Sequence, residues 1–230
     1  HIKKAIEDSL RILQTDYIDL YQMHWPDTIV PIEESLKAFD ALVKEGKVRY
    51  IGTSNDSAYG LTKANEISKY KGYARFESIQ NNFSLLNPRF HDELANVCRL
   101  ENISLLPYSP MAGGVLSGKY CGGFYPEGSR FATYLKESSK RVQAMAHRFV
   151  NERTLEATKK YLELAKEYEV SPVTLAISYS KHFDFVASTI VGARKIEQLD
   201  DSLKAFDFKI SNELLKRIEI IQKDILYPMG

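Results

Sequence analysis

The chain has 230 residues, of which 44% are hydrophobic and 27% charged, and its formal net charge is +1. This is enough apolar material for one sizeable core, while the near-zero charge argues against nucleic acid or an anionic membrane surface as a partner. No run of 18 apolar residues is present, so we read no membrane span. The two cysteines, Cys98 and Cys121, fit neither a disulfide framework nor a zinc or other metal site. We expect a single domain over residues 1–230 in a reducing, cytoplasmic setting.

Helices and strands are predicted to alternate along the chain. Apolar residues at helical spacing predict the helices, and short apolar runs between them predict the strands. Gly46 fits a helix C-terminal cap, while Ser171 and Pro172 fit a helix start. In chain order we expect helix 3–13, strand 17–23, helix 32–45, strand 48–54, helix 57–70, strand 78–80, helix 88–101, strand 103–109, a long loop over 110–135, helices 138–150, 152–168 and 171–180, strand 186–191, and helices 194–206 and 211–225.

This alternation favours an α/β fold with a parallel sheet and helices outside it. The expected elements form five strand–helix units, and parallel strands need such helical crossovers. A (β/α)8 barrel requires eight units. Five units therefore indicate either an open doubly wound sheet or a barrel without its first three units.

Each predicted strand is followed by side chains that can hydrogen-bond, stack or bind phosphate. Because the carboxyl ends of parallel strands meet at one edge, where such folds bind ligands, we expect these side chains to converge there. In chain order they are His24, Trp25 and Asp27; Thr53, Ser54 and Asn55; Gln80, Asn81 and Asn82; Tyr108, Ser109, Met111 and Gly113; and Gly192 and Arg194.

Several of these positions also have a plainer structural interpretation. A lone histidine at a strand end, such as His24, is more often structural than catalytic, and Ser54 and Asn55 can simply cap the next helix. Arg194 at a predicted helix start can bind phosphate together with the helix dipole, or it can be a solvated helix end. Neither a GxGxxG nor a Walker motif is present, which argues against the two standard nucleotide-binding folds.

Five stretches stand out in chain order and extend over nearly the whole chain: LQTDYIDLYQMHWPD, GKVRYIGTSN, QNNFSLLNPRF, LLPYSPMAGGVLSGKY and STIVGARKIEQL. Taken together and in this order, they resemble the aldo-keto reductase superfamily, and in particular its bacterial and plant branch related to voltage-gated potassium channel β-subunits. The resemblance implies a (β/α)8 TIM barrel that binds NADPH or NADP⁺ in an extended pose and reduces aldehydes or ketones to alcohols by hydride transfer.

The resemblance also implies a role for individual residues. His24 matches the histidine of the family's catalytic Asp–Tyr–Lys–His group, and Trp25 lies at the rim where substrate enters. Ser54, Asn55 and Gln80 match the residues that hold the nicotinamide carboxamide, and Tyr108 matches the ring that stacks on the nicotinamide. The remaining cofactor-binding matches are Ser109, Met111, Gly113, Lys119 and Arg130 at the pyrophosphate, Gly192, Arg194 and Gln198 at the 2′-phosphate, and Asp201 at the adenine.

The chain departs from the family pattern in two respects. Ser202 stands where this branch often has an asparagine that contacts adenine. The catalytic Asp, Tyr and Lys come from the first third of the family's chain, and neither Tyr17 nor Tyr21 can replace that tyrosine. We therefore expect a fragment covering about strands 4 to 8, without the first three β/α units, that reduces no carbonyl alone. A cleaved N-terminal part, a naturally truncated inactive protein and completion by another chain remain alternatives.

Two classes of function follow from the resemblance. The first is an NADPH-dependent enzyme acting on small-molecule carbonyl compounds. The second is a nucleotide-binding regulatory module like the channel β-subunits, with little turnover. That group has an asparagine where this chain has His24, which favours the enzyme. A phosphate-binding barrel of other chemistry does not explain Ser54, Asn55, Gln80 and Tyr108 together. The sequence leaves the substrate and a homo-oligomeric state open.

Overall fold

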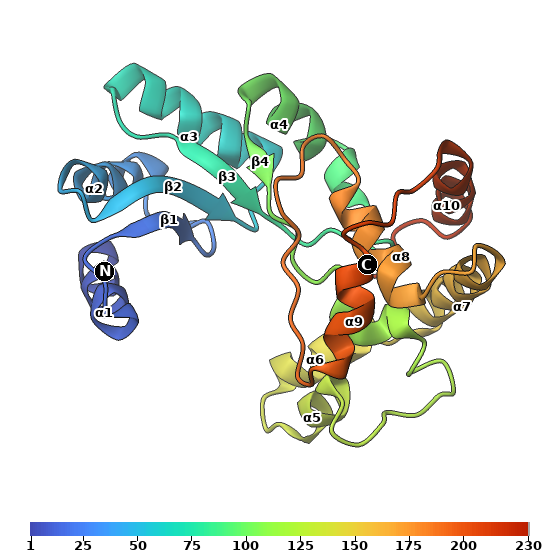
Figure 1. Cartoon of the computed structure of the whole chain (residues 1–230). Coiled ribbons are helices and arrows are strands. Elements are labelled where there is room, and N and C mark those ends of the chain that lie inside the picture. The colour runs from blue at the N-terminus through green and yellow to red at the C-terminus, as the bar shows by residue number, and fades with distance from the viewer. Residues whose placement is uncertain (230) are drawn as a thin grey trace. The chain divides into compact units, whose positions relative to one another are not determined.

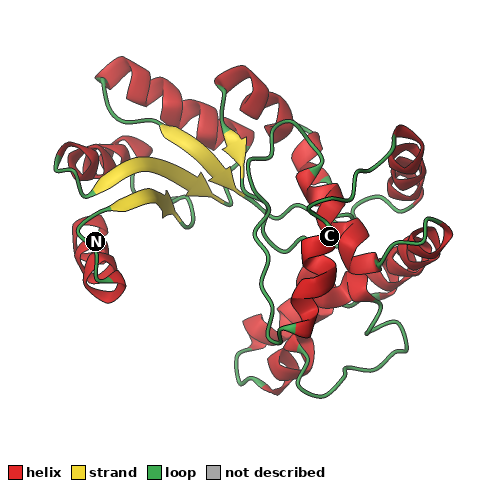
Figure 2. Ribbon diagram, viewed as in Figure 1, coloured by secondary structure: helices red, strands yellow, loops and turns green. Residues whose placement is uncertain are grey.

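The computed structural model describes residues 1–229, and these residues form two compact units. The first unit comprises residues 1–81 and 91–106, and the second comprises residues 82–90 and the chain from 107 onward. Figure 1 labels the elements of both units, and Figure 2 shows that the described strands belong to the first unit.

The first unit is an α/β layer built on a four-stranded parallel sheet in the order β1-β2-β3-β4. The sheet is not closed into a barrel. The described residues hold four of its strands, and the expected fifth strand is not among them. Its elements are α1 (Ile2–Leu13), β1 (Ile18–Met23), α2 (Ile32–Lys44), β2 (Val48–Ser54), α3 (Ala58–Lys71), β3 (Phe76–Gln80), α4 (Leu94–Glu101) and β4 (Ser104–Leu105).

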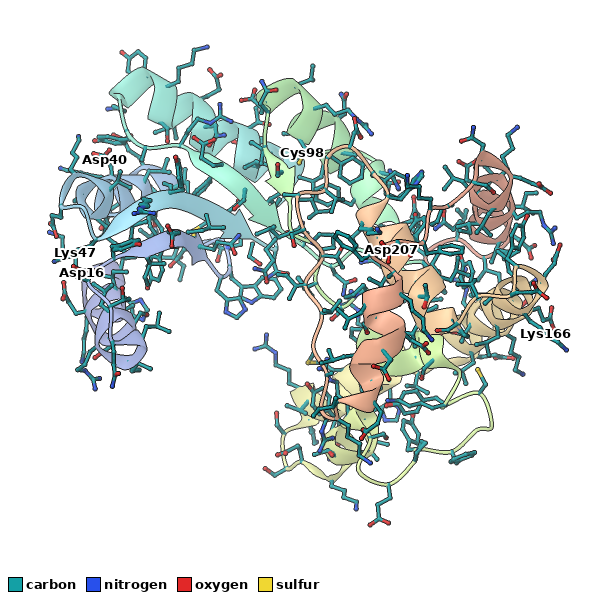
Figure 3. The ribbon with its side chains drawn as sticks, viewed as in Figure 1. Asp16, Asp40, Lys47, Cys98, Lys166 and Asp207 are labelled. Carbon is teal, nitrogen blue, oxygen red and sulfur yellow. The ribbon has the colours of Figure 1, made fainter. Side chains whose placement is uncertain are left out.

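One face of this sheet is buried under the helices. The apolar stripe of α2 places Leu36, Phe39 and Leu42 in the core, and the ring of Phe39 lies 6.0 Å from Tyr21 and 6.4 Å from Phe76. Burying each such side chain fully stabilises the fold by roughly 1.5–3 kcal/mol. Asp40 of the same helix, labelled in Figure 3, accepts the Ala74 N–H at 2.9 Å. Helix α2 is thereby tied to the segment that leads into β3.

The opposite face of the sheet carries polar side chains toward the carboxyl ends of the strands. In the register of the sheet, Gln22 pairs with Gly52, Gly52 with Ser78, and Ser54 with Gln80. Alternation along each strand places these five residues on one face. The register between β2 and β3 shifts between Ile51 and Gly52, and after this shift Gly52 pairs with Ser78. The sheet therefore turns a row of amides and hydroxyls away from α2.

The second unit is mainly helical. Its elements are a 3-10 segment η2 (Ala112–Ser117), α5 (Arg130–Lys136), α6 (Lys140–Phe149), α7 (Glu152–Glu167), α8 (Pro172–Lys181), α9 (Glu197–Lys204) and α10 (Asn212–Asp224), and a 3-10 turn η1 (Arg89–His91) lies where the chain passes between the units. Ser171 caps α8 by accepting the Thr174 N–H at 3.2 Å, with Pro172 in the first turn, as predicted. Phe83 packs against Tyr179, Phe90 and Phe185 in the core.

Two predicted strands differ from the observed ones. The strand expected over 103–109 shrinks to Ser104–Leu105, because Pro107 has no N–H to continue a ladder. The strand expected over 186–191 is wrong, since no strand element covers it within residues 1–229. Ile190 N–H does bond to the Pro107 carbonyl at 2.9 Å. The irregular chain around Pro107 offers this segment no regular strand to pair with.

Two helix starts and one loop also differ. The helix expected over 88–101 begins only at Leu94, after the separate turn Arg89–His91, and the helix expected from 194 begins at Glu197. The loop expected over 110–135 contains η2 and the start of α5, which Ser129 caps through the Ala132 N–H at 3.4 Å. The other predicted helices and strands occur close to their expected bounds, and Gly46 ends α2 at φ +72° as expected. Correspondence with strands 4 to 8 of a longer barrel stays a prediction.

No helix in the described part of the chain combines the length and the apolar character that crossing a membrane requires.

Candidate functional site

The carboxyl ends of β1, β2 and β3 hold a connected set of polar residues, here called the carboxyl-edge cluster: Gln22, His24, Ser54, Asn55 and Gln80. Ser54 Oγ donates to the Gln80 main-chain carbonyl at 2.6 Å, and Asn55 Nδ2 donates to Ser54 Oγ at 3.1 Å. Asn55 Nδ2 also donates to the main-chain carbonyl of His24 at 2.9 Å. These bonds join the ends of three parallel strands, which is where α/β folds bind ligands.

The ring of His24 is exposed and lies beside Trp25, with the two ring centroids 6.1 Å apart. Trp25, the one tryptophan of the chain, is 58% exposed, so most of its large apolar ring faces solvent. Within the described residues, the His24 imidazole has no hydrogen-bond partner, since its main-chain carbonyl alone is engaged. The pair therefore offers a donor or acceptor next to an apolar surface.

Asp56 anchors the loop that carries Ser54 and Asn55. Its carboxylate accepts the Thr53 hydroxyl at 3.0 Å and the Ser57 N–H at 2.8 Å, and Ser57 in turn caps α3. Asp56 is 6% exposed, and this burial raises its pKa despite the opposing hydrogen bonds from Thr53 and Ser57. Asn55 has φ +56°, in the left-handed region that asparagine tolerates better than most residues. The loop is thus held in one conformation.

In the second unit, Tyr108 begins a tightly turned, glycine-rich segment. The Tyr108 ring is half-buried, and burial raises the pKa of its hydroxyl. Ser109, Gly113 and Gly114 all have positive φ, at +55°, +66° and +97°. A Cβ at Gly113 would lie 2.5 Å from Phe131 Cζ, and one at Gly114 would lie 2.7 Å from Lys119 Nζ. The segment therefore needs glycine at both positions, and it brings the Lys119 ammonium close to the main chain.

Other predicted pyrophosphate residues lie in or next to this segment. Met111 is half-buried and precedes η2, where its carbonyl accepts the Gly114 N–H at 2.9 Å. Arg130 is exposed at the first position of α5.

Arg194 and Gln198 are in direct contact at the start of α9. Gln198 Oε1 accepts the main-chain N–H of Arg194 at 2.9 Å and that of Lys195 at 3.4 Å, which closes the turn before the helix. The Arg194 guanidinium donates to the Gly128 carbonyl at 2.5 Å and is otherwise exposed. Gly192 is exposed, and nothing within 4 Å of its Cβ position demands glycine. Arg194 can therefore offer further N–H groups to an anion.

Asp201 is already engaged on α9. Its carboxylate pairs with Lys204 at 3.0 Å, and hydrogen bonds from Lys204 and then Ser171 lower its pKa. Its main-chain carbonyl accepts the Thr174 hydroxyl at 2.8 Å. Ser202 donates its hydroxyl to the Gln198 carbonyl at 3.1 Å. A ligand contact by Asp201 would thus compete with an existing ion pair.

The structure brings the predicted site residues into two groups, one in each unit. His24, Ser54, Asn55 and Gln80 form one hydrogen-bonded set with exposed Trp25 beside His24. In the second unit the predicted residues fall on the glycine-rich segment and around the start of α9. Their roles in binding stay predictions.

Sequence reasoning missed Gln22, which lies at the centre of the carboxyl-edge cluster. Its amide bonds to Gln80, Thr53 and Ser78. Gln22 stands two positions before His24. Side chains two positions apart in a strand lie on the same face, so an extended chain through His24 would place both residues on one face. A glutamine near the end of a mostly apolar strand was the available signal.

Neither a reactive thiol at Cys98 nor a metal-binding cluster is added to the site by the described residues. Burial raises the pKa of the Cys98 thiol to about 12, so this cysteine, labelled in Figure 3, is no ready nucleophile. Among residues 1–229, no group of three or more His, Cys, Asp or Glu side chains could hold a metal ion.

Comparison with known proteins identifies the family. The family model described as "Aldo/keto reductase family" matches residues 1–223. The chain is 33% identical to "Protein tas" of Escherichia coli (strain K12) over 99% of its length, 31% identical over 96% to "Putative voltage-gated potassium channel subunit beta" of Schizosaccharomyces pombe, and 34% identical over 95% to "Putative aryl-alcohol dehydrogenase C977.14c" of the same yeast. It spans 68%, 64% and 59% of the lengths of these relatives.

Oxidoreductases are among these matched relatives, which supports a general oxidoreductase role. The expected resemblance is confirmed along nearly the whole chain, and with it the α/β class of the fold. The chain belongs to the aldo/keto reductase family.

Proposed function

We propose that the protein is an NADPH-dependent oxidoreductase that reduces aldehydes or ketones to alcohols. The observation that carries the proposal is the hydrogen-bonded set of Ser54, Asn55 and Gln80 beside His24. Its place at the carboxyl ends of parallel strands is where a ligand binds in this class of fold. The relatives with alcohol dehydrogenase names point to the same chemistry.

The carboxyl-edge cluster fits the carboxamide of a nicotinamide. Gln80 Oε1 accepts no hydrogen bond within the described residues, and Gln80 Nε2 uses one of its two N–H groups on Gln22. A carboxamide presents two N–H donors and a carbonyl acceptor, so it can satisfy both open positions on Gln80. We assign the carboxamide contacts to Gln80, Ser54 and Asn55.

The second unit fits the phosphates of the same cofactor class. The glycine-rich segment turns through left-handed residues beside the Lys119 ammonium, whose positive charge suits a diphosphate. In the proposal, Ser109, Met111, Gly113, Lys119 and Arg130 contact the pyrophosphate. Arg194 binds the 2′-phosphate through its guanidinium, supported by Gln198 and Gly192, and Asp201 lies near the adenine. Since a 2′-phosphate needs a cation, Arg194 favours NADPH over NADH.

Bound NADPH supplies the hydride, and the chain's residues hold and orient the reactants. The exposed His24 imidazole donates a hydrogen bond to the carbonyl oxygen, which orients the substrate and stabilises the negative charge that develops there. The Asn55 bond to the His24 carbonyl fixes this loop against the carboxamide contacts. In the proposal, Tyr108 would be the ring that stacks on the nicotinamide.

Trp25 gives the substrate side of the site its apolar character. Its ring is largely exposed next to His24, so it can cover one face of an aryl or other hydrophobic aldehyde. The proposed substrate class is therefore hydrophobic carbonyl compounds rather than charged ones.

The tyrosines closest to His24 in the sequence are not placed to donate the proton. Tyr17 precedes β1 at the opposite end of the strand, with the Arg49 guanidinium 4.2 Å from its ring centroid. Tyr21 packs on Phe39 beneath the helices. The proposal therefore gives this chain the binding and orienting roles and assigns proton donation to neither tyrosine.

A second candidate function is a nucleotide-binding subunit with little turnover. The relative named as a putative channel β-subunit is 31% identical, close to the 34% of the relative named as an alcohol dehydrogenase. Both candidates share NADPH binding and differ in turnover. His24 favours the enzyme, because an imidazole can donate to a substrate oxygen.

Oxidation of NADPH, followed by its absorbance with a panel of aryl and alkyl aldehydes, tests the proposal on the full-length protein. We expect turnover with hydrophobic aldehydes, a fall in kcat of at least about tenfold in His24→Asn, and an unchanged KM for NADPH. His147→Asn, which changes an exposed histidine of α6, is the matched control. Binding of NADPH without turnover of any aldehyde would favour the regulatory subunit, and absence of NADPH binding would refute both.

A further inference from the structure

Gln22 lies inside the carboxyl-edge cluster with every polar atom of its amide engaged. Gln22 Nε2 donates to the Thr53 carbonyl and to Ser78 Oγ, both at 3.3 Å. Gln22 Oε1 accepts from Gln80 Nε2 at 2.8 Å, the shortest of the three bonds. An apolar side chain could occupy this position of the sheet, but Gln22 places an amide there whose nitrogen and oxygen are both hydrogen-bonded.

These partners fix which way the Gln22 amide points. The Thr53 main-chain carbonyl can only accept a hydrogen bond, so the nitrogen of Gln22 must face it. The oxygen of Gln22 then faces Gln80, and an oxygen can be met there only by a donor. Gln80 must therefore turn its NH₂ group toward Gln22. Its oxygen is left pointing away from Gln22, without a partner in residues 1–229.

Packing around Gln22 holds this arrangement. Gly52 lies between Gln22 and Ser78 in the register of the sheet. A Cβ at Gly52 would lie 2.4 Å from Ser78 Oγ and 3.2 Å from Gln22 Cγ. Ser78 itself is only 6% exposed. The absence of a side chain at Gly52 is thus what lets the amide of Gln22 reach Ser78.

We propose that Gln22 is a positioning residue that makes Gln80 present its oxygen, rather than its nitrogen, to the ligand. The inference rests on the proposed function, in which Gln80 contacts the nicotinamide carboxamide. A carboxamide N–H can donate to the Gln80 oxygen, whereas an acetyl group in the same place has no N–H to give. The relay from Thr53 through Gln22 to Gln80 therefore selects a ligand with an amide.

The test compares NADP⁺ with its 3-acetylpyridine analogue, which replaces the carboxamide by an acetyl group. Calorimetric titration of the full-length protein measures the dissociation constant of each. We expect the wild-type protein to bind the analogue about three- to tenfold more weakly, the effect of one neutral hydrogen bond. In Gln22→Met, Gln80 can rotate to present either atom, so we expect the ratio to fall to near one.

Two further variants separate positioning from a general structural effect. Asn65 is a buried amide of the same unit, bonded through both of its polar atoms to the main chain of Phe76. Asn65→Leu should lower the melting temperature while keeping the wild-type ratio. Gln22→Glu keeps an acceptor oxygen toward Gln80 although it cannot donate to the Thr53 carbonyl. Gln80 must then still turn its NH₂ group toward residue 22, so the wild-type ratio should persist, and this tests the inference even if Gln22→Met fails to fold.

The outcomes are distinct. A wild-type ratio in folded Gln22→Met, or a lowered ratio in folded Gln22→Glu, overturns the inference and leaves the proposed function standing. The same fall in ratio in Asn65→Leu also overturns it, because the effect would then be structural. If the wild-type protein binds neither NADP⁺ nor the analogue, the proposed function fails, and this inference fails with it.

Discussion

The side-chain amide of Asn55 donates a hydrogen bond to the main-chain carbonyl of His24 at 2.9 Å. This bond joins the loop after β2 to the loop after β1, and Asn55 holds a left-handed φ of +56° while making it. One residue therefore sets both the path of its own loop and the place of the proposed catalytic histidine.

Asn55→Gly and Asn55→Ala separate these two contributions. Glycine tolerates the left-handed φ, so Asn55→Gly should lose the bond to His24 with only a small loss of stability. Asn55→Ala should lose about 1 kcal/mol more, because alanine is strained at this φ. Urea unfolding measures the difference between the variants, and kcat should fall in both. Equal stability of the two variants would show that the backbone strain does not matter here.

Arg194→Met should abolish the preference for the 2′-phosphate. Charge-assisted bonds to a phosphate are the strong ones, so we expect NADPH binding to weaken by about 10- to 100-fold and NADH binding to change little. Arg217→Met is the control, because Arg217 is an exposed arginine whose guanidinium pairs with Glu167 on the surface. A parallel loss of both nucleotides in Arg194→Met would argue against phosphate recognition by this residue.

Gly113→Ala should destabilise the protein more than Gly123→Ala. Both glycines have positive φ, at +66° and +76°, but only the added Cβ at Gly113 meets an atom, at 2.5 Å from the ring of buried Phe131. We expect a loss of about 1 kcal/mol for Gly123→Ala and about 2–4 kcal/mol for Gly113→Ala, which combines strain with overpacking. Thermal unfolding checks the order, and similar losses would mean that Phe131 moves aside freely.

Asp56→Asn should change how stability depends on pH. Burial raises the pKa of Asp56, so the folded protein holds this proton more tightly than the unfolded chain. The stability that protonation contributes is full below the unfolded pKa and is lost as pH rises through the folded pKa. Asparagine removes this dependence, so the melting temperature of Asp56→Asn relative to wild type should be higher at pH 7 than near pH 3.5. A difference that is constant with pH would contradict this.

Much of the fold was predictable because local signals and packing agree. The caps at Ser171 and Gly46 and the apolar faces of the helices indicate element positions with little help from distant contacts. The strand expected over 186–191 failed because strand formation depends on a partner. Its neighbour around Pro107 cannot form a ladder, and that depends on tertiary pairing that no local pattern reports.

The candidate site was predictable in its residue types but not in its connections. The polar strand ends stood out in the sequence because Ser54, Asn55 and Gln80 interrupt apolar runs. The relay through Gln22 could not be read there, since it requires the register that sets Gln22 beside Gly52 and Gly52 beside Ser78. The existing ion pair of Asp201 with Lys204 likewise appears only in three dimensions.

Binding of the nicotinamide carboxamide by the carboxyl-edge cluster is best measured through the dissociation constant of NADPH in Gln80→Leu. Calorimetric titration of wild type and variant, with 2′,5′-ADP as a ligand that lacks the nicotinamide, gives the comparison. We expect Gln80→Leu to bind NADPH about tenfold more weakly and to bind 2′,5′-ADP as wild type does. Equal NADPH affinity in the two proteins, or wild-type affinity for NADPH no greater than for 2′,5′-ADP, would contradict it.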